Sequence, residues 1–365
     1  MMPRLTVVGC GAVVDQYYRG ALMKLERRGV ARVIALVDPD SDRAAALARH
    51  FRSAGVFPPP AEAFNRASTD LTIIASPPSV HAAHAEAAFA AGSHVLCEKP
   101  MAANIDDAER MVAAARAARR VLAVGMTRRM YPYLAEARSL IAAGALGEHV
   151  RFVHREGSVY GWPLSTDFAF RRATAGGGVL MDKGTHVLDF LAALFGEPVP
   201  CAYADDGHGD GVETNCRIAL LFPRATGTVQ LSWSQPLVNG LRIAGSAGEL
   251  TMHPWRPDAV RWRRDGGAWE TRVSEATWPR DLRPEGRRGK PWTYEECVYY
   301  QLVQVLRAMV HGEAVPVTGE EGLMIMKAIE ACYRLASPLR FTWLTEDEQA
   351  RADVRHWSRQ QCAAA

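Results

Sequence analysis

The sequence predicts a doubly wound α/β domain over residues 1–126, followed by a separate domain over residues 127–344. In the first part, short apolar runs that end in turn residues alternate with alanine-rich amphipathic stretches. This pattern is typical of a parallel sheet covered by helices on both faces. The length of 365 residues is sufficient for two cores. All nine tryptophans lie at or after position 162, which indicates that the two parts do different work.

Each element of the first domain follows from its own stretch of sequence. The strands are predicted from apolar runs bounded by turn residues, and the helices from the longer stretches between them. Ligands of such a sheet bind beyond the carboxyl ends of its strands, so the segments that follow the strands are candidates for the site. The predicted strands cover residues 5–9, 33–38, 71–76, 94–98 and 121–125, and the predicted helices cover 13–28, 42–50, 79–91 and 104–119.

The first strand runs into a glycine-rich turn that is typical of dinucleotide binding. Gly9 allows the tight turn, and Gly11 allows a pyrophosphate to approach the start of the helix. The backbone N–H groups of Ala12 and Val13 are then expected to face that anion. The third position of the fingerprint is Val14 instead of glycine. Partial fingerprints of this kind also occur in plain turns, so the interpretation depends on the surrounding segments.

The second strand ends at Asp38, where a carboxylate accepts the ribose hydroxyls of NAD. The same carboxylate would repel the 2′-phosphate of NADP, so NAD is the expected cofactor and NADP is less favoured. Arg43 lies close enough in the sequence to weaken this preference. The alternative interpretation of Asp38 is a turn-forming residue before Pro39.

Two further loops follow strands of the same sheet and are expected to border the nicotinamide half of the cofactor. Ser76 and Pro78 follow one strand, and Glu98 and Lys99 follow the next. Lys99 is one of only five lysines among 43 lysines and arginines. A lysine can lose its proton when it is buried, whereas a guanidinium in effect cannot, and this indicates a chemical role. His81, just beyond Pro78, is expected to be a solvent-exposed residue of a helix, and the alternative is that it lines the same crevice.

A second motif lies in the second domain. After the glycines of 176–178, residues 179–195 are predicted to be helical. Asp182, His186 and Asp189 are spaced by four and three residues and therefore share one face of that helix. The alternative interpretation is a capped surface helix with Asp182 near its positive end.

Lys99, Asp182 and His186 together form the candidate catalytic set. Oxidation of a secondary alcohol needs a base for the hydroxyl proton while hydride leaves to the nicotinamide. His186 is the expected base, because an imidazole titrates near neutral pH, and Lys99 is the second candidate. Asp182 is expected to fix the substrate hydroxyl or to orient the other two residues.

The second domain also contains residues suited to a polyhydroxylated ring. Tyr160 and Trp162 offer apolar surface to the C–H faces of a sugar or cyclitol, and Arg129, one of two adjacent arginines, is a candidate substrate-side cation. With Asp182 and His186 they form the expected substrate-binding set. The alternatives are aromatic packing against a sheet or an interface, and a solvated arginine pair between the domains.

Several stretches resemble the glucose–fructose oxidoreductase / inositol dehydrogenase (Gfo/Idh/MocA) family. The matching segments are IIASPPSVHAAHAEAAFAAGSHVLCEKPMA, within residues 71–126, and GGGVLMDKGTHVLD further along. Weaker similarity, in GMTRRMYPYLAEARSLIAAGALGEHVRFVHREG and VTGEEGLMIMKAIEACYRLA, extends the resemblance over most of residues 5–336. It implies an N-terminal Rossmann domain and a C-terminal α+β domain whose large, open, mostly antiparallel sheet commonly forms an oligomer interface. A homo-oligomer, either a dimer or a tetramer, is therefore expected. Val14 and Lys183 depart from the family pattern.

Composition argues against several other classes. A formal net charge of +3 is too small to indicate a nucleic-acid or membrane partner, and no run of about 18 apolar residues is present. The seven cysteines are scattered and never spaced as Cys-x-x-Cys, which predicts reduced thiols in the cytoplasm and no metal site. Residues 251–292 mix basic residues with tryptophans, but interspersed acids and turns indicate hairpins and a substrate-side loop there. Helices at about 294–311 and 320–336 are predicted to close the second domain, and 345–365 forms a polar tail.

The expected function is an NAD-dependent oxidoreductase that acts on a ring hydroxyl of a sugar, aminosugar or cyclitol. Two alternatives stay open. One is a non-enzymatic NAD(P)-binding regulatory protein, and the other is redox-neutral sugar chemistry that passes through a transient oxidation.

Overall fold

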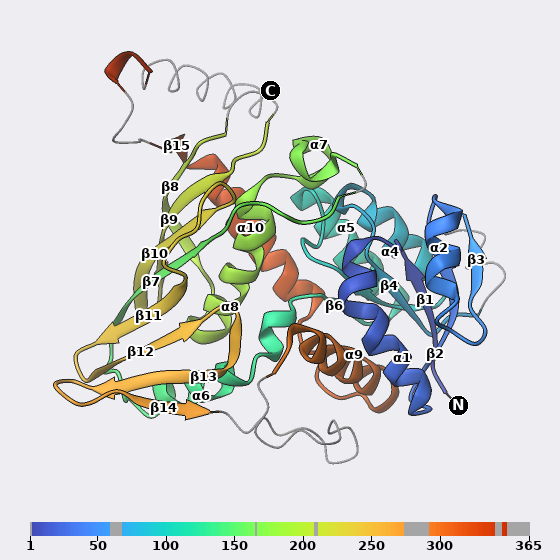
Figure 1. Cartoon of the computed structure of the whole chain (residues 1–365), viewed down its shortest axis with the longest axis horizontal. Helices are drawn as coiled ribbons and strands as arrows, with labels where there is room; N and C mark the ends of the chain where they lie inside the picture. Colours follow the sequence, from blue (N-terminus) through green and yellow to red (C-terminus); the bar gives the residue numbers. More distant parts are fainter. Residues whose placement is uncertain are drawn as a thin grey trace.

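The computed structural model describes residues 2–58, 68–164, 166–207, 211–273, 292–339 and 345–348. Figure 1 shows two lobes side by side: a first lobe built on strands β1–β6, which starts at the N-terminus, and a second lobe built on strands β7–β15. The predicted combination of an α/β Rossmann domain and an α+β domain is confirmed.

In the described part of the chain, the first lobe contains a six-stranded parallel sheet with the order β3-β2-β1-β4-β5-β6. This is the order of doubly wound dinucleotide-binding sheets, and it places the ends of β1 and β4 at the switch point where ligands bind. Five strands coincide with predicted ones, while β3 was not predicted because it is short and lies at the sheet edge. The strands are β1 (Arg4–Val8), β2 (Arg32–Val37), β3 (Gly55–Phe57), β4 (Leu71–Ile74), β5 (His94–Cys97) and β6 (Leu122–Val124).

Helices cover both faces of this sheet, because alternate residues of each strand point to opposite sides. In β1, Val8 packs in the core that contains α4 and α5, whereas Leu5 and Val7 pack in the core that contains α1 and α2. The helical segments of this lobe are η1 (Val14–Tyr18), α1 (Arg19–Arg27), α2 (Ser41–Ala48), η2 (Pro78–Val80), α4 (His81–Ala90) and α5 (Ile105–Ala118).

A helix from the C-terminal part of the chain completes the core of the first lobe. α9 (Tyr294–His311) packs against α1 and η1, and its buried residues Val298, Leu302 and Leu306 join the same core as Leu22 and Leu25. α9 also contacts η3 (Thr127–Met130) of the second lobe, so it packs between the two lobes and does not close the second domain alone. α10 (Gly319–Arg334) contacts α5 of the first lobe as well as α8 (Thr185–Phe195) and β8 (Val199–Asp205) of the second.

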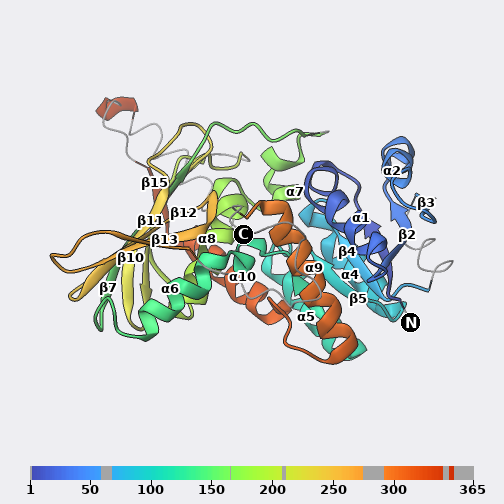
Figure 2. The same cartoon turned by 60° about the horizontal axis from the view of Figure 1, so that its bottom comes forward.

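The second lobe contains a sheet of nine described strands in the order β14-β13-β12-β11-β7-β10-β9-β8-β15. Its pairs are antiparallel except β7 with β10 and β8 with β15, which confirms the mostly antiparallel sheet. Figure 2 shows α6, α8 and α10 on the side of this sheet that faces the first lobe. Its strands are β7 (Val150–Gly157), β8 (Val199–Asp205), β9 (Asn215–Phe222), β10 (Ala225–Ser232), β11 (Gly240–Gly245), β12 (Gly248–His253), β13 (Arg256–Arg264), β14 (Glu270–Val273) and β15 (Ala336–Pro338), and its helical segments are η3 (Thr127–Met130), α6 (Pro132–Ala142), η4 (Phe168–Phe170), α7 (Arg172–Ala175), η5 (Leu180–Gly184) and α8 (Thr185–Phe195).

Strands β12 to β14 form the antiparallel hairpins predicted for the tryptophan-rich basic segment, of which residues 274–291 lie outside the described residues. Of the predicted polar tail, only 345–348 is described. None of the helices in the described ranges is both long and apolar enough to cross a membrane.

Candidate active site

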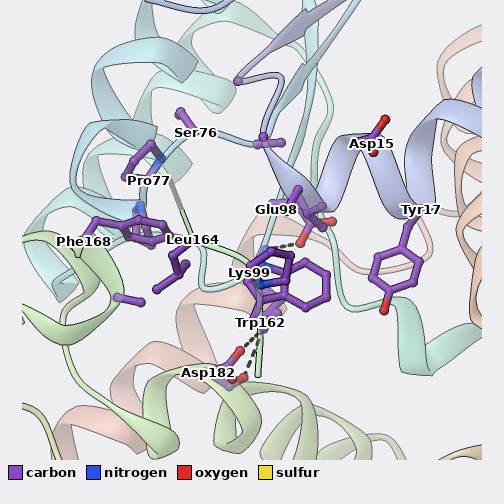
Figure 3. A pocket seen from close by; sticks show the side chains of 18 of the residues that line it. Asp15, Tyr17, Ser76, Pro77, Glu98, Lys99, Trp162, Leu164, Phe168 and Asp182 are labelled. Atoms are coloured by element: carbon purple, nitrogen blue, oxygen red, sulfur yellow. Dashed lines mark hydrogen bonds and ion pairs between the residues drawn. The ribbon is translucent and has the colours of Figure 1, made fainter. Parts of the chain in front are cut away.

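A cavity of about 1870 Å³ lies where the two lobes meet. The first lobe borders it with the segments that follow β1, β2, β4 and β5, and the second lobe with the loop after β7 and the start of the helix that leads into α8. Figure 3 shows Ser76, Glu98 and Lys99 on one side of this cavity and Asp182 on the other. Pockets for drug-sized ligands measure about 300–1,000 Å³, so this one has room for a dinucleotide and a small ring.

The glycine turn after β1 leaves space for a ligand at the start of a helix. Gly9 has a φ of +91°, and a Cβ atom there would lie 2.6 Å from the backbone just beyond β4, so a side chain does not fit. A Cβ atom on Gly11 would meet nothing within 4 Å, and Gly11, Ala12 and Val13 line the cavity. The first N–H groups of a helix lack partners inside it, so this turn fits a pyrophosphate. Val14, at the third fingerprint position, is buried in the core of the first lobe.

Asp38 lines the cavity, but both of its carboxylate oxygens already accept hydrogen bonds. Oδ2 accepts from the Cys10 N–H at 2.7 Å, and Oδ1 accepts from the Asp40 N–H at 2.9 Å. The Arg43 guanidinium lies 3.4 Å from Oδ1. The carboxylate therefore fixes both the glycine turn after β1 and the turn after β2 in which Asp38 itself lies. A carboxylate has about four lone-pair sites, so it retains acceptor capacity for a ribose.

Glu98 holds the loop that carries Lys99. The Tyr18 hydroxyl donates to Oε1 of Glu98 at 2.5 Å, and the Lys99 N–H donates to Oε2 at 3.0 Å. Glu98 is buried, and burial raises the pKa of its carboxyl group. Just after β6, a Cβ atom at Gly125 would lie 2.9 Å from Oε1 of Glu98, so only glycine fits at this position. Glu98 thus holds the backbone of Lys99 in place and also lines the cavity.

His81 is buried, which corrects the expectation that it is exposed to solvent. Its Nε2 lies 2.6 Å from the carbonyl oxygen of Ser76, and its Nδ1 lies 3.3 Å from that of Met101. These contacts join the loop after β4 to the loop after β5. The Ser76 hydroxyl also contacts Nδ1 of His84 at 3.0 Å, and Ser76 and Pro78 line the cavity.

The ion pair between Lys99 and Asp182 brings two predicted catalytic residues together from different lobes. The Lys99 ammonium lies 2.5 Å from Oδ1 of Asp182 and 3.3 Å from its carbonyl oxygen. The indole N–H of Trp233 donates to Oδ2 of the same carboxylate at 3.2 Å. The Lys99 side chain is 17% exposed, so its cation is largely withdrawn from water.

His186 lies on α8, just after the π-helical segment η5 that carries Asp182, and lines the same cavity. Burial lowers the pKa of its imidazole well below the usual range, and the cations of Lys99 and Arg128 lower it further. Its Nδ1 is buried and has no hydrogen-bond partner among the described residues. The ring is therefore neutral at neutral pH, and a neutral imidazole offers one acceptor nitrogen.

Aromatic side chains form the second-lobe wall. Tyr160 and Trp162, on the loop after β7, line the cavity. Tyr160 packs edge-on against Trp233, with ring centroids 4.8 Å apart, and burial raises the pKa of its phenol to about 12. Trp162 stacks on Tyr17 of the first lobe at 5.8 Å. This stack bridges the two lobes at the border of the cavity.

Arg129 does not line the cavity, which contradicts its prediction as a substrate-binding residue. Its guanidinium donates to both carboxylate oxygens of Asp189 at 2.8 Å and to Glu321 at 3.0 Å, so its donors join η3 to α8 and α10. Its neighbour Arg128 faces the cavity instead, in a buried bidentate pair with Glu156 at 2.7 Å. Burial alone opposes ionisation of Glu156, but Arg128 holds the pKa of that carboxyl well below its usual range.

Lys183 lines the cavity beside Asp182. Its ammonium donates to the Ser158 hydroxyl at 2.8 Å and to the Ser232 carbonyl oxygen at 3.0 Å. Burial lowers the pKa of this ammonium. The residue that departs from the family pattern thus connects the ends of β7 and β10 at the second-lobe side of the cavity.

Sequence reasoning did not single out Glu156 or Trp233, although both line the cavity. One signal was available for Glu156: it falls on the inward face of β7, whose burial alternates along the strand. A charged residue at an inward position is uncommon unless it is paired. For Trp233, no local pattern indicated a contact with Asp182 across the fold.

Comparisons with known proteins agree with this architecture. The profile described as "Oxidoreductase family, NAD-binding Rossmann fold" (GFO_IDH_MocA) matches residues 4–126, and that of the GFO/IDH/MocA C-terminal domain matches residues 134–251. Inositol 2-dehydrogenase of Acidothermus cellulolyticus is 27% identical over 325 residues, which cover 80% of this chain and 88% of that protein. D-glucoside 3-dehydrogenase of Escherichia coli is 31% identical over 199 residues, 53% of this chain and 54% of that protein. The structure of aldose-aldose oxidoreductase from Caulobacter crescentus, complexed with glycerol, superposes with a TM-score of 0.77 at 26% identity, over 92% of this chain and 97% of that one.

Proposed function

Because the chain belongs to the GFO/IDH/MocA family of NAD-binding oxidoreductases, we propose that it transfers hydride between a nicotinamide cofactor and a ring secondary alcohol. The ring is a sugar, aminosugar or cyclitol. The observation that carries the proposal is the convergence of Lys99, Asp182 and His186 on one cavity beyond the strand ends. Relatives named as inositol and glucoside dehydrogenases support a polyhydroxylated ring.

NAD is the proposed cofactor, and when bound it supplies the acceptor or donor of hydride. The open space over Gly11 and the N–H groups of the following helix fit its pyrophosphate. The Asp38 carboxylate is placed for its ribose and disfavours a 2′-phosphate. The proposed cofactor-binding residues are Gly9, Gly11, Ala12, Val13, Asp38, Ser76, Pro78, Glu98 and Lys99.

Lys99 and His186 have complementary roles toward one substrate hydroxyl. The Lys99 ammonium, which contacts Asp182, is a hydrogen-bond donor, so it holds the hydroxyl oxygen and stabilises negative charge that develops on it. His186 is neutral and takes the hydroxyl proton during oxidation, or returns it during reduction. Asp182, held by Trp233, fixes the direction of the Lys99 ammonium. These assignments make Lys99, Asp182 and His186 the proposed catalytic residues.

The substrate ring is proposed to lie against the second-lobe wall. Tyr160 and Trp162 present aromatic surface there, and Arg128 and Lys183 supply donors at the far end in place of Arg129. Asp182 and His186 bind the reacting hydroxyl. The aromatic rings suit the C–H faces of a ring, while the cations suit its remaining oxygens.

The proposal is tested by incubating the protein with NAD⁺ and a panel of aldoses, aminosugars, glycosides and inositols. Absorbance of reduced nicotinamide is expected with at least one ring, and its rate of increase is expected to fall by at least about 100-fold in Lys99→Met and His186→Asn variants. Product formation without net absorbance change would instead identify the redox-neutral reaction. Tight NADH binding with no turnover on the whole panel would instead support the alternative of a non-enzymatic, regulatory dinucleotide-binding protein. Unchanged turnover in both variants would overturn the assigned roles.

A homo-oligomer is also proposed, with contact through the sheet face of the second lobe that points away from the helices. Val153 and Leu221 are exposed apolar residues on this sheet, 41% and 44% exposed. Burying apolar surface of this kind favours association. Light scattering on the purified chain is expected to give a dimer or tetramer, and a monomer at all concentrations would contradict this.

A further inference from the structure

Glu213 binds the start of the helical segment that contains the second motif. It precedes β9 and is 0% exposed. Its Oε1 accepts hydrogen bonds from the N–H groups of Gly178 and Leu180, each at 3.0 Å, and its main-chain oxygen accepts one from Val179 at 2.9 Å. One residue therefore bonds three consecutive N–H groups. Such groups at a helix start have no partner within the helix, and a carboxylate there also complements the helix dipole.

The glycines before this segment are explained by the same contact. A Cβ atom at Gly178 would overlap the main-chain oxygen of Glu213, and one at Gly177 would overlap the Tyr333 hydroxyl. That hydroxyl donates to Oε1 of Glu213 at 2.9 Å. The run of glycines thus permits the close approach of Glu213 and Tyr333 to the helix start.

The segment that contains Glu213 reaches Asp182 by a second route. The main-chain oxygen of Thr214, the next residue, accepts a hydrogen bond from the Trp233 N–H at 2.7 Å. The Trp233 indole N–H in turn donates to Oδ2 of Asp182 at 3.2 Å. The helix start and the indole that holds the Asp182 carboxylate are therefore fixed by two adjacent residues.

Glu213 itself does not touch the reacting atoms, because it is not among the residues that line the cavity. Burial raises the pKa of its carboxyl group, and the Arg172 guanidinium, 3.9 Å from Oε2, opposes that rise. In either protonation state Oε1 remains an acceptor for the helix start. A glutamine at this position would keep such an oxygen, whereas an alanine would not.

We propose that Glu213 is a positioning residue: it holds the start of the helix so that the Asp182 carboxylate and the His186 ring face Lys99. The hydrogen bonds from the Gly178 and Leu180 N–H groups to Oε1 are proposed to fix the position of the helix start. The kinetic consequence rests on the proposed dehydrogenase function, while the structural consequence at Trp233 does not.

The kinetic test compares Glu213→Ala, Glu213→Gln and Glu213→Asp with the wild type. Glu213→Ala is expected to lower kcat by about 10- to 100-fold, because a small displacement of catalytic groups costs about that much. The dissociation constant for NADH is expected to change less than about twofold, since Glu213 lies away from the glycine turn. Glu213→Gln is expected to restore most of kcat. Glu213→Asp keeps the charge but shortens the reach, so it resembles the alanine variant and serves in its place if that variant does not fold.

A matched control separates positioning from a loss of stability. Glu249 is also largely buried, accepts hydrogen bonds from Arg242 and Arg263, and does not line the cavity. Glu249→Ala is expected to lower the melting temperature and leave kcat unchanged. If Glu213→Ala lowers the melting temperature but keeps kcat, Glu213 is structural only and the proposal fails. Equal loss of kcat in the glutamine and alanine variants would also overturn it.

A second readout needs no turnover. The indole N–H resonance of Trp233, assigned with Trp233→Phe in a nitrogen-15 correlation spectrum, reports the hydrogen bond to Asp182. It is expected to shift in Glu213→Ala and to keep its wild-type position in Glu213→Gln and Glu249→Ala. An unmoved resonance in Glu213→Ala would refute the positioning role. Because this measurement is independent of any substrate, it distinguishes failure of the positioning role from failure of the proposed dehydrogenase activity.

Discussion

Lys99 and Asp182 come from different lobes, and their side chains meet at 2.5 Å inside the cavity. Lys99 follows β5 of the Rossmann sheet, and Asp182 lies in η5 before α8. The ion pair therefore depends on the relative position of the lobes, as does any chemistry that uses both residues. The Trp162–Tyr17 stack crosses the same boundary.

Replacement of Lys99 by arginine tests whether the site needs an ammonium or only a positive charge. Lys99→Arg retains the charge, but a planar guanidinium does not reproduce the compact ammonium contact with Asp182. We expect kcat to fall by about 10²–10⁴-fold in both Lys99→Arg and Lys99→Met, with NADH affinity largely kept. The exposed Lys327, paired with Glu109 at 3.0 Å, provides the control Lys327→Arg, for which no change is expected. Near-normal turnover in Lys99→Arg would exclude a specific role for the lysine.

The lowered pKa of His186 sets the expected pH dependence of oxidation. A base must be neutral to accept a proton, and lowering its pKa moves the loss of activity to more acidic pH. We therefore expect kcat/KM to stay constant as the pH falls through about 6.5, the usual histidine pKa, and to drop only below it. The measurement is kcat/KM for the best ring substrate as a function of pH. An acidic limb centred at or above that value, and still present in His186→Asn, would assign the base elsewhere.

Loss of the stack between Trp162 and Tyr17 is expected to weaken substrate binding more than chemistry. An aromatic pair contributes about 0.5–1.5 kcal/mol, so Trp162→Ala should raise KM for the ring by about 2- to 12-fold, with a smaller change in kcat. Trp269, which packs under Arg263 on the outer hairpins, gives the control Trp269→Ala. Equal effects on KM in the two variants would show that Trp162 has no specific place in substrate binding.

The position of Asp38 predicts a cofactor preference that a single substitution reverses in part. In the wild type, kcat/KM is expected to be higher with NAD⁺ than with NADP⁺, because the carboxylate repels a 2′-phosphate while Arg43 is partly engaged by Asp38 and Asp40. Asp38→Ala is expected to lower the ratio of the two values by about tenfold or more. The ratio is the informative quantity, because loss of the bond to the Cys10 N–H loosens the turn for both cofactors. The exposed Asp42 serves as the control, and a ratio unchanged in Asp38→Ala would contradict the assignment.

His84 is expected to make the fold sensitive to acid. Burial lowers its pKa to about 4, whereas an unfolded histidine binds a proton below about pH 6.5. Between these values the unfolded chain binds more protons, so the stabilising contribution is complete above the upper value and is lost as the pH falls toward the lower one. Denaturant unfolding at several pH values is expected to show a weaker pH dependence in His84→Gln than in the wild type, by at most about 1.4 kcal/mol per pH unit. The exposed His311→Gln should match the wild type, and identical slopes in all three proteins would disprove the prediction.

Local patterns in the sequence were sufficient for the first sheet and for the motif helix. Strands such as Leu71–Ile74 are short, apolar and bounded by turns, and these properties do not depend on distant residues. The edge strand Gly55–Phe57 was missed because three residues with one exposed valine carry no such signal.

Orientation within the site could not be predicted, because it depends on partners far away in the chain. Arg128 and Arg129 are adjacent in a 3₁₀ turn, and only the positions of Glu156 and Asp189 decide which of them faces the cavity. His81 was expected to be a solvent-exposed residue of a helix, yet it is buried and contacts two loops. The packing of α9 against the first lobe was not predicted for a similar reason, since an amphipathic pattern does not say which lobe covers its apolar face.

The placement of α9 has a consequence for exchanging parts between relatives. Most of its buried apolar residues pack in the core of the first lobe, although the segment that encodes it comes after most of the second lobe. A chimera that joins this Rossmann sheet to the entire remainder of another family member would pair α1 with a foreign helix. A compatible swap would retain the native α9 together with η3, which it also contacts, and import only the segment between them. The dinucleotide-binding lobe is therefore encoded by two separate parts of the gene.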